Sequence, residues 1–228
     1  MNIFIVHAHP ESQSFTSAMK DAAVADFTAA GHQVVVSDLS AMSWNPVASA
    51  ADFGTRGNAD YMNYALEQRT NADAQTLAPD IVAELEKPEA ADLVIFSFPL
   101  YWFSVPAILK GWFDRVFVSG RVYGGRRFYD QGGLKGKSAM LALTTGGRDH
   151  MLSEGGIHGD IKSILMPVLQ GTLAYTGMTV LPPFVGYHVP YLSHEARTDI
   201  LQDFRRHAAD WQQHTPLTMP VLAAFDRE

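Results

Sequence analysis

Short apolar runs alternate with longer segments of helical periodicity along most of the chain. The longer of these runs are apolar at nearly every position rather than at every second one, which is typical of parallel strands that are covered on both faces. The predicted strands are residues 2–7, 33–37, 93–98 and 138–143, with a shorter fifth strand at 178–181.

Helical segments separate these predicted strands. The first begins at Ser14 and ends at Gly31, which would serve as its C-terminal cap. The other predicted helices are residues 79–86, 105–118, 157–175 and 195–211. Because strand-helix-strand units require right-handed crossovers between parallel strands, we expect an α/β fold: a doubly wound, five-stranded parallel sheet with helices on both faces.

The length and composition favour one domain. A chain of 228 residues that is 47% hydrophobic can bury one full core. Residues 41–78 are rich in Asn, Ala, Asp and Ser and form a long excursion, a feature that is usually functional or bound to a partner. We therefore expect a single domain over 1–228, with this excursion and a short C-terminal tail after about residue 212.

Composition also excludes several classes of function. The chain has no cysteine, so disulfides, thiolate metal sites and redox dithiols are excluded, and electron transfer would need a bound cofactor. The net charge is −7 and no long basic run occurs, so we expect no nucleic-acid partner. No apolar stretch of about 18 residues and no signal peptide is apparent, so we expect a cytoplasmic protein without membrane insertion. The histidines form no closed ligand set, and we predict no metal.

Ligands of doubly wound sheets bind beyond the carboxyl ends of the strands. After the first strand, residues 9–16 lead into a helix start, where unpaired amides and the helix dipole favour a phosphate. The simpler interpretation, that Ser14 or Thr16 only caps the helix, is equally consistent with this loop. The chain contains neither a G-x-G-x-x-G motif nor a P-loop.

Three further features follow the later strands. Residues 101–103 read Tyr-Trp-Phe, and such rings either plug the core or bind a flat ligand. The glycines of residues 144–147 either allow a ligand to approach the backbone or form a tight turn. His158 lies among glycines at another helix start, where a structural histidine is the more common explanation.

Taken together, these segments resemble the NAD(P)H:quinone oxidoreductase family of the DT-diaphorase type. The longest match begins with Phe98-Pro99-Leu100 and ends with Arg115-Val116-Phe117. The matching segments lie in residues 8–20, 37–39, 45–46, 79–84, 90–96, 98–117, 144–147 and 156–160. The resemblance extends from the first strand to about Arg197.

This resemblance implies a flavodoxin-like homodimer with strand order 2-1-3-4-5 and one flavin per subunit, FAD in the usual case and FMN as a possibility. It implies an NAD(P)H dehydrogenase (quinone) with a ping-pong mechanism. NAD(P)H would reduce the flavin and leave, and a quinone-like acceptor would then take two electrons in the same slot.

By position, the resemblance also assigns site residues. The cofactor-binding residues would be His9, Ser14, Phe15, Thr16, Pro99, Leu100, Tyr101, Trp102, Phe103, Asp114, Thr145, Gly146, Gly147 and Arg197. Asp114 and Arg197 match positions that secure the adenosine half, which favours FAD. The acceptor slot would be formed by Trp102, Phe103, Tyr123, Phe128, Tyr175 and His158, with Tyr123 coming from the other subunit.

His158 would be the catalytic residue, because a fixed donor stabilises the charge that builds on a flavin during reduction. In the family a tyrosine shares this role in a proton relay, but Leu152 stands at that position, so the relay cannot operate unchanged. Gly125 occupies the place of a slot tyrosine. The rim of the slot also differs at Tyr101, Arg126 and Arg127.

Three alternatives stay open at this point. The same slot and hydride chemistry would serve an azo or nitro reductase. A flavin-binding regulatory subunit of a potassium efflux system resembles the same family. A one-electron flavodoxin carrier ranks last, because residues 9–16 lack the glycines of a flavodoxin phosphate loop.

Overall fold

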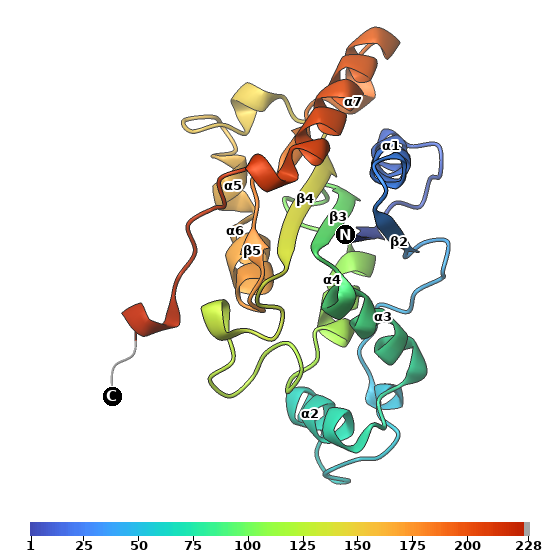
Figure 1. Ribbon diagram of the computed structural model, residues 1–228, viewed down its shortest axis with the longest axis vertical. Coiled ribbons are helices and arrows are strands. Elements are labelled where there is room, and N and C mark those ends of the chain that lie inside the picture. Colours follow the sequence, from blue (N-terminus) through green and yellow to red (C-terminus); the bar gives the residue numbers. More distant parts are fainter. Residues whose placement is uncertain (226–228) are drawn as a thin grey trace.

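The computed structural model describes residues 1–225 and contains a six-stranded parallel sheet (Figure 1). The strands are β1 (Asn2–His7), β2 (Gln33–Asp38), β3 (Leu93–Pro99), β4 (Ser138–Thr144), β5 (Thr179–Val180) and β6 (Phe184–Gly186). Their order is β2-β1-β3-β4-β5, and β6 also pairs with β4. Every strand pair is parallel, which confirms the predicted fold class.

The fifth position of the sheet is divided between two short strands. β5 pairs with Ser138 and Ala139 at the start of β4, whereas β6 pairs with residues 142–144 at its end. Pro182 and Pro183 lie between them and cannot donate to the ladder, so one continuous strand is not possible there. The predicted fifth strand is therefore shorter than expected, and β6 was not predicted.

Helices cover both faces of the sheet. They are α1 (Phe15–Ala29), α2 (Tyr64–Ala74), α3 (Pro79–Ala90), α4 (Ala107–Val116), α5 (Ile161–Ile164), α6 (Met166–Val168) and α7 (His194–Ala209). Side chains alternate across β1: Ile3 and Ile5 face the cluster formed with α1 and α7, and Phe4 and Val6 face α3 and α4. Both faces of the central strands β1, β3 and β4 are buried, so these strands are mainly apolar, whereas the edge strand β2 is partly exposed. None of the helices within residues 1–225 is long and apolar enough to span a membrane.

The excursion predicted at 41–78 is mostly irregular but includes α2, which was not predicted. A buried ion pair holds it against α4: Arg115, 3% exposed, donates to Asp52 at 2.8 Å and also pairs with Asp80 at 2.8 Å. Gly111 permits this close approach, because a Cβ there would lie 2.1 Å from the carbonyl oxygen of Pro46. The excursion is thus a packed part of the domain.

The helix predicted at 157–175 is wrong in its start and its regularity. Gly159 has a φ of +79°, and Asp160 caps the next turn by accepting a hydrogen bond from the Ser163 amide at 3.0 Å, so the helix begins only at Ile161. After α6 the chain widens into a π-helix over Leu169–Ala174. Such wide turns are common near functional sites because they redirect the side chains that follow.

Candidate functional site

A cavity of about 410 Å³ lies at the carboxyl ends of the strands. Loops that follow β1, β3 and β4 form most of its wall, and residues 189–197 close it. It is lined by His9, Gln13, Ser14, Phe15, Thr16, Pro99, Leu100, Tyr101, Thr144, Thr145, Gly146, Val189, Pro190 and Arg197. The structure thus brings together ten of the predicted cofactor-binding residues.

The start of α1 presents an anion site to this cavity. Ser14 does cap the helix, accepting a hydrogen bond from the Ser17 amide at 3.0 Å. This cap leaves the amides of Phe15 and Thr16 without a hydrogen-bond partner in the described part of the chain. Both residues line the cavity, and so does the cationic Arg197 of α7. Capping and phosphate binding are therefore compatible, and this donor set suits a diphosphate.

A buried network supports this loop from below. The His7 side chain is 0% exposed, and its ring nitrogens lie 3.0 Å from Ser97 Oγ and 3.1 Å from Ser17 Oγ. Burial lowers the pKa of His7 to about 4, so the ring is neutral at pH 7. Ser17 Oγ in turn donates to the Glu11 carbonyl at 2.9 Å. The network ties β1 and β3 to the loop that begins α1.

The aromatic loop after β3 is a tight turn. Tyr101 and Ser104 exchange backbone hydrogen bonds of 3.0 and 2.9 Å, and Trp102 and Phe103 between them have φ values of 50° and 58°. Bulky residues rarely adopt this left-handed conformation, and such strain is found mainly at functional sites. The Trp102 side chain is 97% exposed, so it does not plug the core. Among residues 1–225, neither the Trp102 amide nor the Phe103 amide has a partner.

The glycine loop after β4 is held open by β6. The Thr145 amide donates to the Gly186 carbonyl at 2.9 Å, and the His188 amide donates to the Gly147 carbonyl at 2.9 Å. Leu152, the residue at the position of the family's relay tyrosine, is 2% exposed. A Cβ on Gly147 would lie 3.0 Å from Leu152 Cδ1, so Leu152 packs beneath the loop. It offers no hydroxyl to the cavity.

A second cavity of about 420 Å³ lies between α2, α4 and the π-helix. Tyr123 and Tyr175 line it, with ring centroids 5.8 Å apart, and the Phe128 ring stacks on Tyr175 at 5.7 Å. Asp114 also lines this cavity, where Lys110 binds its carboxylate at 2.6 and 2.8 Å. The structure does not bring Asp114 to Arg197 within one chain.

The predicted slot residues therefore form two separate groups. His158 is exposed and packs on Phe103, with ring centroids 5.3 Å apart, next to Trp102. Tyr123, Phe128 and Tyr175 form the other group around the second cavity. No aromatic contact joins the two groups within residues 1–225.

Four residues that line the strand-end cavity were not among the predicted site residues, namely Gln13, Thr144, Val189 and Pro190. Gln13 and Thr144 nevertheless lie in the loops 9–16 and 144–147 that the sequence indicated. Thr144 Oγ1 lies 2.8 Å from Thr16 Oγ1 and joins β4 to the start of α1. Val189 and Pro190 follow β6, a strand that no apolar run in the sequence predicts.

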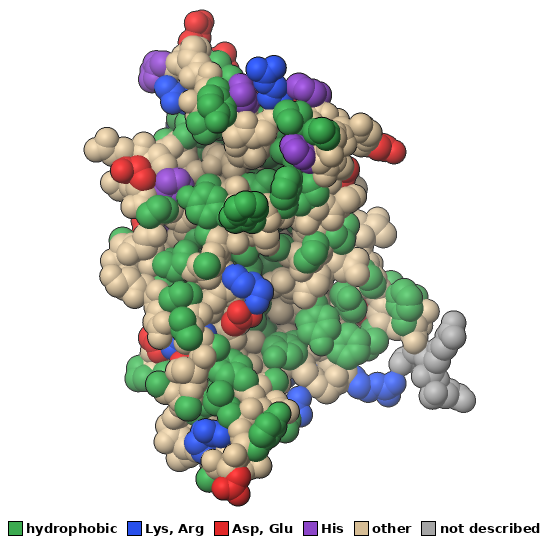
Figure 2. Space-filling model, turned by 180° about the vertical axis from the view of Figure 1, so that it is seen from behind, with side chains coloured by type: hydrophobic (Ala, Val, Ile, Leu, Met, Phe, Trp, Pro, Cys, Tyr) green, Lys and Arg blue, Asp and Glu red, His purple; other side chains and the backbone are tan. Residues whose placement is uncertain are grey.

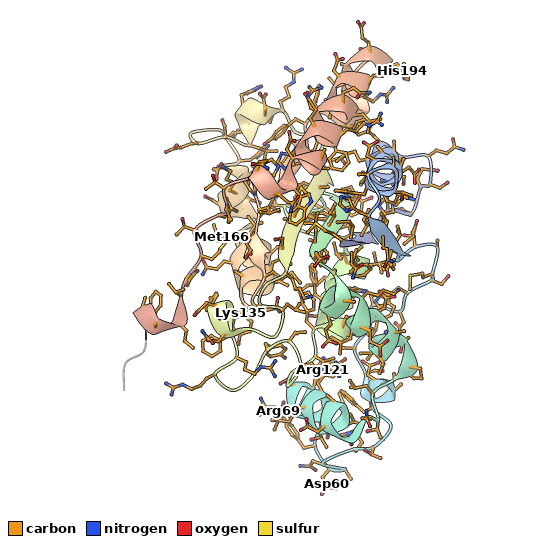
Figure 3. The ribbon with its side chains drawn as sticks, in the orientation of Figure 1. Asp60, Arg69, Arg121, Lys135, Met166 and His194 are labelled. Atoms are coloured by element: carbon orange, nitrogen blue, oxygen red, sulfur yellow. The ribbon has the colours of Figure 1, made fainter. Side chains whose placement is uncertain are left out.

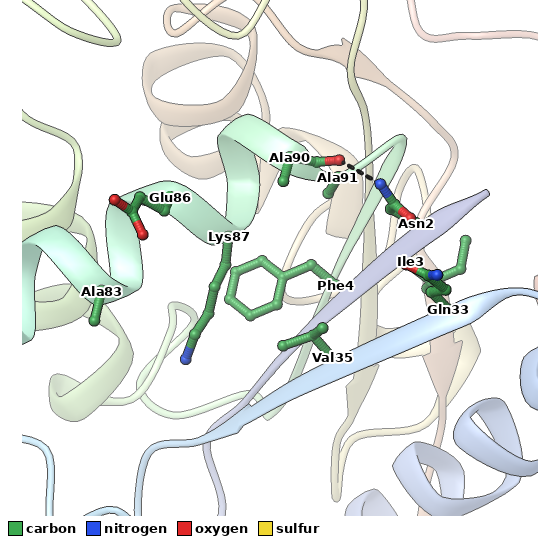
Figure 4. A pocket seen from close by; sticks show the side chains of 10 residues that line it. All are labelled: Asn2, Ile3, Phe4, Gln33, Val35, Ala83, Glu86, Lys87, Ala90 and Ala91. Atoms are coloured by element: carbon green, nitrogen blue, oxygen red, sulfur yellow. Dashed lines mark hydrogen bonds between the residues drawn. The ribbon is translucent and has the colours of Figure 1, made fainter.

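A smaller cavity of about 260 Å³ lies between α3 and the β1–β2 edge (Figure 4). Asn2, Ile3 and Gln33 line it, so it is at the amino ends of the strands, away from the loops described above. Its cation, Lys87, is already bound to the buried carboxylate of Glu84. This cavity does not contribute to the strand-end site.

These features define a doubly wound α/β protein of flavodoxin-like fold with a strand-end cavity whose unpaired amides and Arg197 suit a phosphate group. The flavodoxin-like fold family model matches residues 1–214. The chain is 43% identical over 223 residues to NAD(P)H dehydrogenase [quinone] 1 of Rattus norvegicus, covering 97% of this chain and 81% of the relative. It is 44% identical over 196 residues to ribosyldihydronicotinamide dehydrogenase [quinone] of Homo sapiens, covering 86% and 85%.

A solved structure agrees with these matches. The crystal structure of a proposed quinone reductase from Klebsiella pneumoniae superposes with a TM-score of 0.90 at 38% identity, covering 95% of this chain and 86% of that one. The chain belongs to the flavodoxin-like family of NAD(P)H:quinone oxidoreductases.

Proposed function

We propose that this protein is a flavin-dependent NAD(P)H:quinone oxidoreductase that transfers electrons in pairs to quinone-like acceptors by a ping-pong mechanism. The observation that carries the proposal is the strand-end cavity, where unpaired amides at the α1 start meet a strained aromatic turn and an open glycine loop. Two relatives support it by name: one is an NAD(P)H dehydrogenase [quinone], and the other, a ribosyldihydronicotinamide dehydrogenase [quinone], shares the acceptor but is named for a different donor.

The cavity fits a flavin nucleotide by the chemistry of its donors. The amides of Phe15 and Thr16, with Arg197, would hold the phosphates. The amides of the aromatic turn would bind one edge of the ring system, and Thr145 and Gly146 would contact its other side. The bound flavin supplies the ability to take a hydride from NAD(P)H and to pass two electrons to the acceptor.

We favour FAD over FMN because the cavity continues beyond the phosphate site. A groove of about 350 Å³ between α1 and α7 shares Gln13, Ser14, Phe15 and Arg197 with it. An adenosine half would fit this groove beside Arg197. Chromatography of the cofactor released by heat tests the assignment: FAD is expected, and FMN alone would contradict it.

His158 would act as a hydrogen-bond donor toward the negative charge that develops during reduction. It would act without the tyrosine of the family's relay, because Leu152 lies buried beneath Gly147. The proton that the reduced acceptor needs would then come from His158 itself or from water.

A homodimer would unite the two halves of the acceptor slot. One subunit offers Trp102, Phe103 and His158, and its partner would offer the group around Tyr175. Trp102 is 97% exposed, which is costly for so large an apolar ring unless another surface covers it. Hydrophobic side chains are frequent across the face in Figure 2, where charged side chains lie toward the ends and in one basic and acidic group near the centre. Light scattering should give twice the mass of one chain, and a monomer would refute the shared slot.

Steady-state kinetics test the reaction. Initial rates at several fixed quinone concentrations should give parallel double-reciprocal lines, because donor and acceptor use one slot in turn. Intersecting lines would contradict the ping-pong mechanism.

A kcat/KM higher for azo or nitro compounds than for quinones would favour the reductase alternative. A flavoprotein without reductase activity that co-purifies with a potassium efflux system would favour the regulatory alternative. The cytoplasmic location remains part of this proposal.

A further inference from the structure

Arg69 of α2 lies across the turn at residues 119–125. A Cβ on Gly124 would lie 2.6 Å from an Arg69 guanidinium nitrogen, and one on Gly120 would lie 3.1 Å from Arg69 Cγ. Both glycines have positive φ values, +114° and +90°. The two glycines thus leave the space that Arg69 occupies. Figure 3 labels Arg69 on α2 and Arg121 on the neighbouring segment.

The charge of Arg69 has no partner in the described chain. It is half-buried, and it forms no ion pair or hydrogen bond with any residue from 1 to 225. Two arginines of the neighbouring turn differ from it: Arg121 pairs with Glu89 at 2.6 Å, and Arg127 donates to the Gly120 carbonyl at 3.1 Å. In a protein of net charge −7, a half-buried cation without a carboxylate is unusual. An anionic group of a bound molecule would supply the partner that Arg69 lacks.

Arg69 also lies beside the acceptor slot. Tyr123 lies between Gly120 and Gly124, the two glycines that lie against Arg69. The Tyr123 ring lines the 420 Å³ cavity. Burial raises the pKa of the Tyr123 hydroxyl, and the positive charge of Arg69 partly opposes this shift, which indicates that the two groups are close. Asp114 is the carboxylate of this cavity, and Lys110 already neutralises it. Lys110 therefore weakens the repulsion between Asp114 and an anion held by Arg69.

We propose that Arg69 is a specificity-determining residue that binds an acidic substituent of the molecule in the aromatic slot. This inference rests on the proposed function, because it assumes that Tyr123 and Tyr175 wall the slot. The substituent is a carboxylate, sulfonate or phosphate. It belongs either to an acidic quinone-like acceptor or to the 2′-phosphate of NADPH.

The test compares Arg69→Gln with Arg121→Gln, which removes a neighbouring arginine that has a partner. We expect Arg69→Gln to lower kcat/KM roughly tenfold for one acidic ligand, the effect of one partly buried charge-assisted hydrogen bond. If the acceptor is the source, the loss appears with a sulfonated naphthoquinone and not with menadione. If the donor is the source, it appears with NADPH and not with NADH. Arg121→Gln should change neither the kcat/KM ratio of the sulfonated naphthoquinone to menadione nor that of NADPH to NADH.

If Arg69→Gln leaves both kcat/KM ratios, sulfonated naphthoquinone to menadione and NADPH to NADH, at the wild-type value, the proposal is overturned. A rescue variant sharpens the result: Arg69→Lys keeps the charge and should retain most of the preference, and a loss equal to that of Arg69→Gln would argue against a charge effect. Melting temperatures of the two Arg69 variants should match the wild type, because Arg69 has no hydrogen-bond or ion-pair partner within residues 1–225 to lose.

A binding measurement separates this inference from the proposed function. Calorimetry of the flavin-loaded protein with a redox-inert naphthalene sulfonate and with 2-naphthol needs no turnover. Preferential sulfonate binding that disappears in Arg69→Gln would support the anion site even if no quinone is reduced. Quinone reduction without any sulfonate or NADPH preference in the wild type would leave the proposed function intact and refute the role of Arg69.

Discussion

Buried His7 makes a quantitative prediction about pH and stability. The folded protein holds its imidazole neutral with a pKa of about 4, whereas an unfolded histidine has a pKa of 6.5. Between these values the unfolded state binds more protons than the folded state, so acid favours unfolding. The stabilising contribution is fully present above pH 6.5 and is lost as the pH falls toward 4.

The size of the effect follows from these two pKa values. From pH 7 to pH 5, His7 should lower the free energy of unfolding by roughly 2 kcal/mol, and by about 3 kcal/mol once the pH reaches 4. His9 and His207 also have pKa values lowered first by burial, so the wild type should lose still more. The difference between the wild type and a His7 variant isolates the contribution of His7.

The assay is urea unfolding followed by tryptophan fluorescence at pH 7 and pH 5, at equal flavin concentration. His7→Gln cannot take up a proton, and its amide can still bond to Ser97 and Ser17. Its free energy of unfolding should change between the two pH values by roughly 2 kcal/mol less than that of the wild type. His150→Gln, whose imidazole is exposed and lines none of the cavities described above, is the control for loss of one imidazole. A His7→Gln variant with the wild-type pH dependence would refute the reasoning.

Three further predictions concern catalysis and packing. His158→Ala should slow flavin reduction by NADPH roughly 100-fold in stopped-flow absorbance while flavin stays bound, and an unchanged rate would remove it from the mechanism. Arg115→Met should lower the free energy of unfolding by about 3 to 5 kcal/mol, because it strands buried Asp52, whereas Lys110→Met should cost less than about 1 kcal/mol; equal losses would contradict the burial argument. Gly111→Ala places a Cβ 2.1 Å from a backbone oxygen and should lower the melting temperature, whereas Gly171→Ala meets nothing within 4 Å and should not.

The central strands β1, β3 and β4 were predictable because burial on both faces makes them mainly apolar, and the edge strand β2 was predictable from its run of three valines. β6 was not, because Phe184–Gly186 is too short for a pattern and its pairing depends on the free edge of β4. Helix α2 was not predicted for a different reason. Its buried residues are Glu67, Gln68 and Asn71, which are stabilised by hydrogen bonds rather than by an apolar stripe.

The site was predictable where it depends on topology. The loops after β1, β3 and β4 converge because parallel strands end at the same edge, and the resemblance named their residues. The separation of Tyr175 from Phe103 depends on how the π-helix and the aromatic turn pack, which spacing in sequence does not encode. The same holds for Arg69, whose position follows from the space left by two distant glycines.

The central claim is electron transfer in pairs from NAD(P)H through a bound flavin to a quinone. Its most direct test is the anaerobic absorption spectrum of the purified protein during titration with NADPH and then with menadione. We predict that one NADPH per bound flavin bleaches the flavin band and that one menadione per flavin restores it. A protein that cannot be loaded with flavin, or a band that NADPH and NADH leave unchanged, would contradict the account.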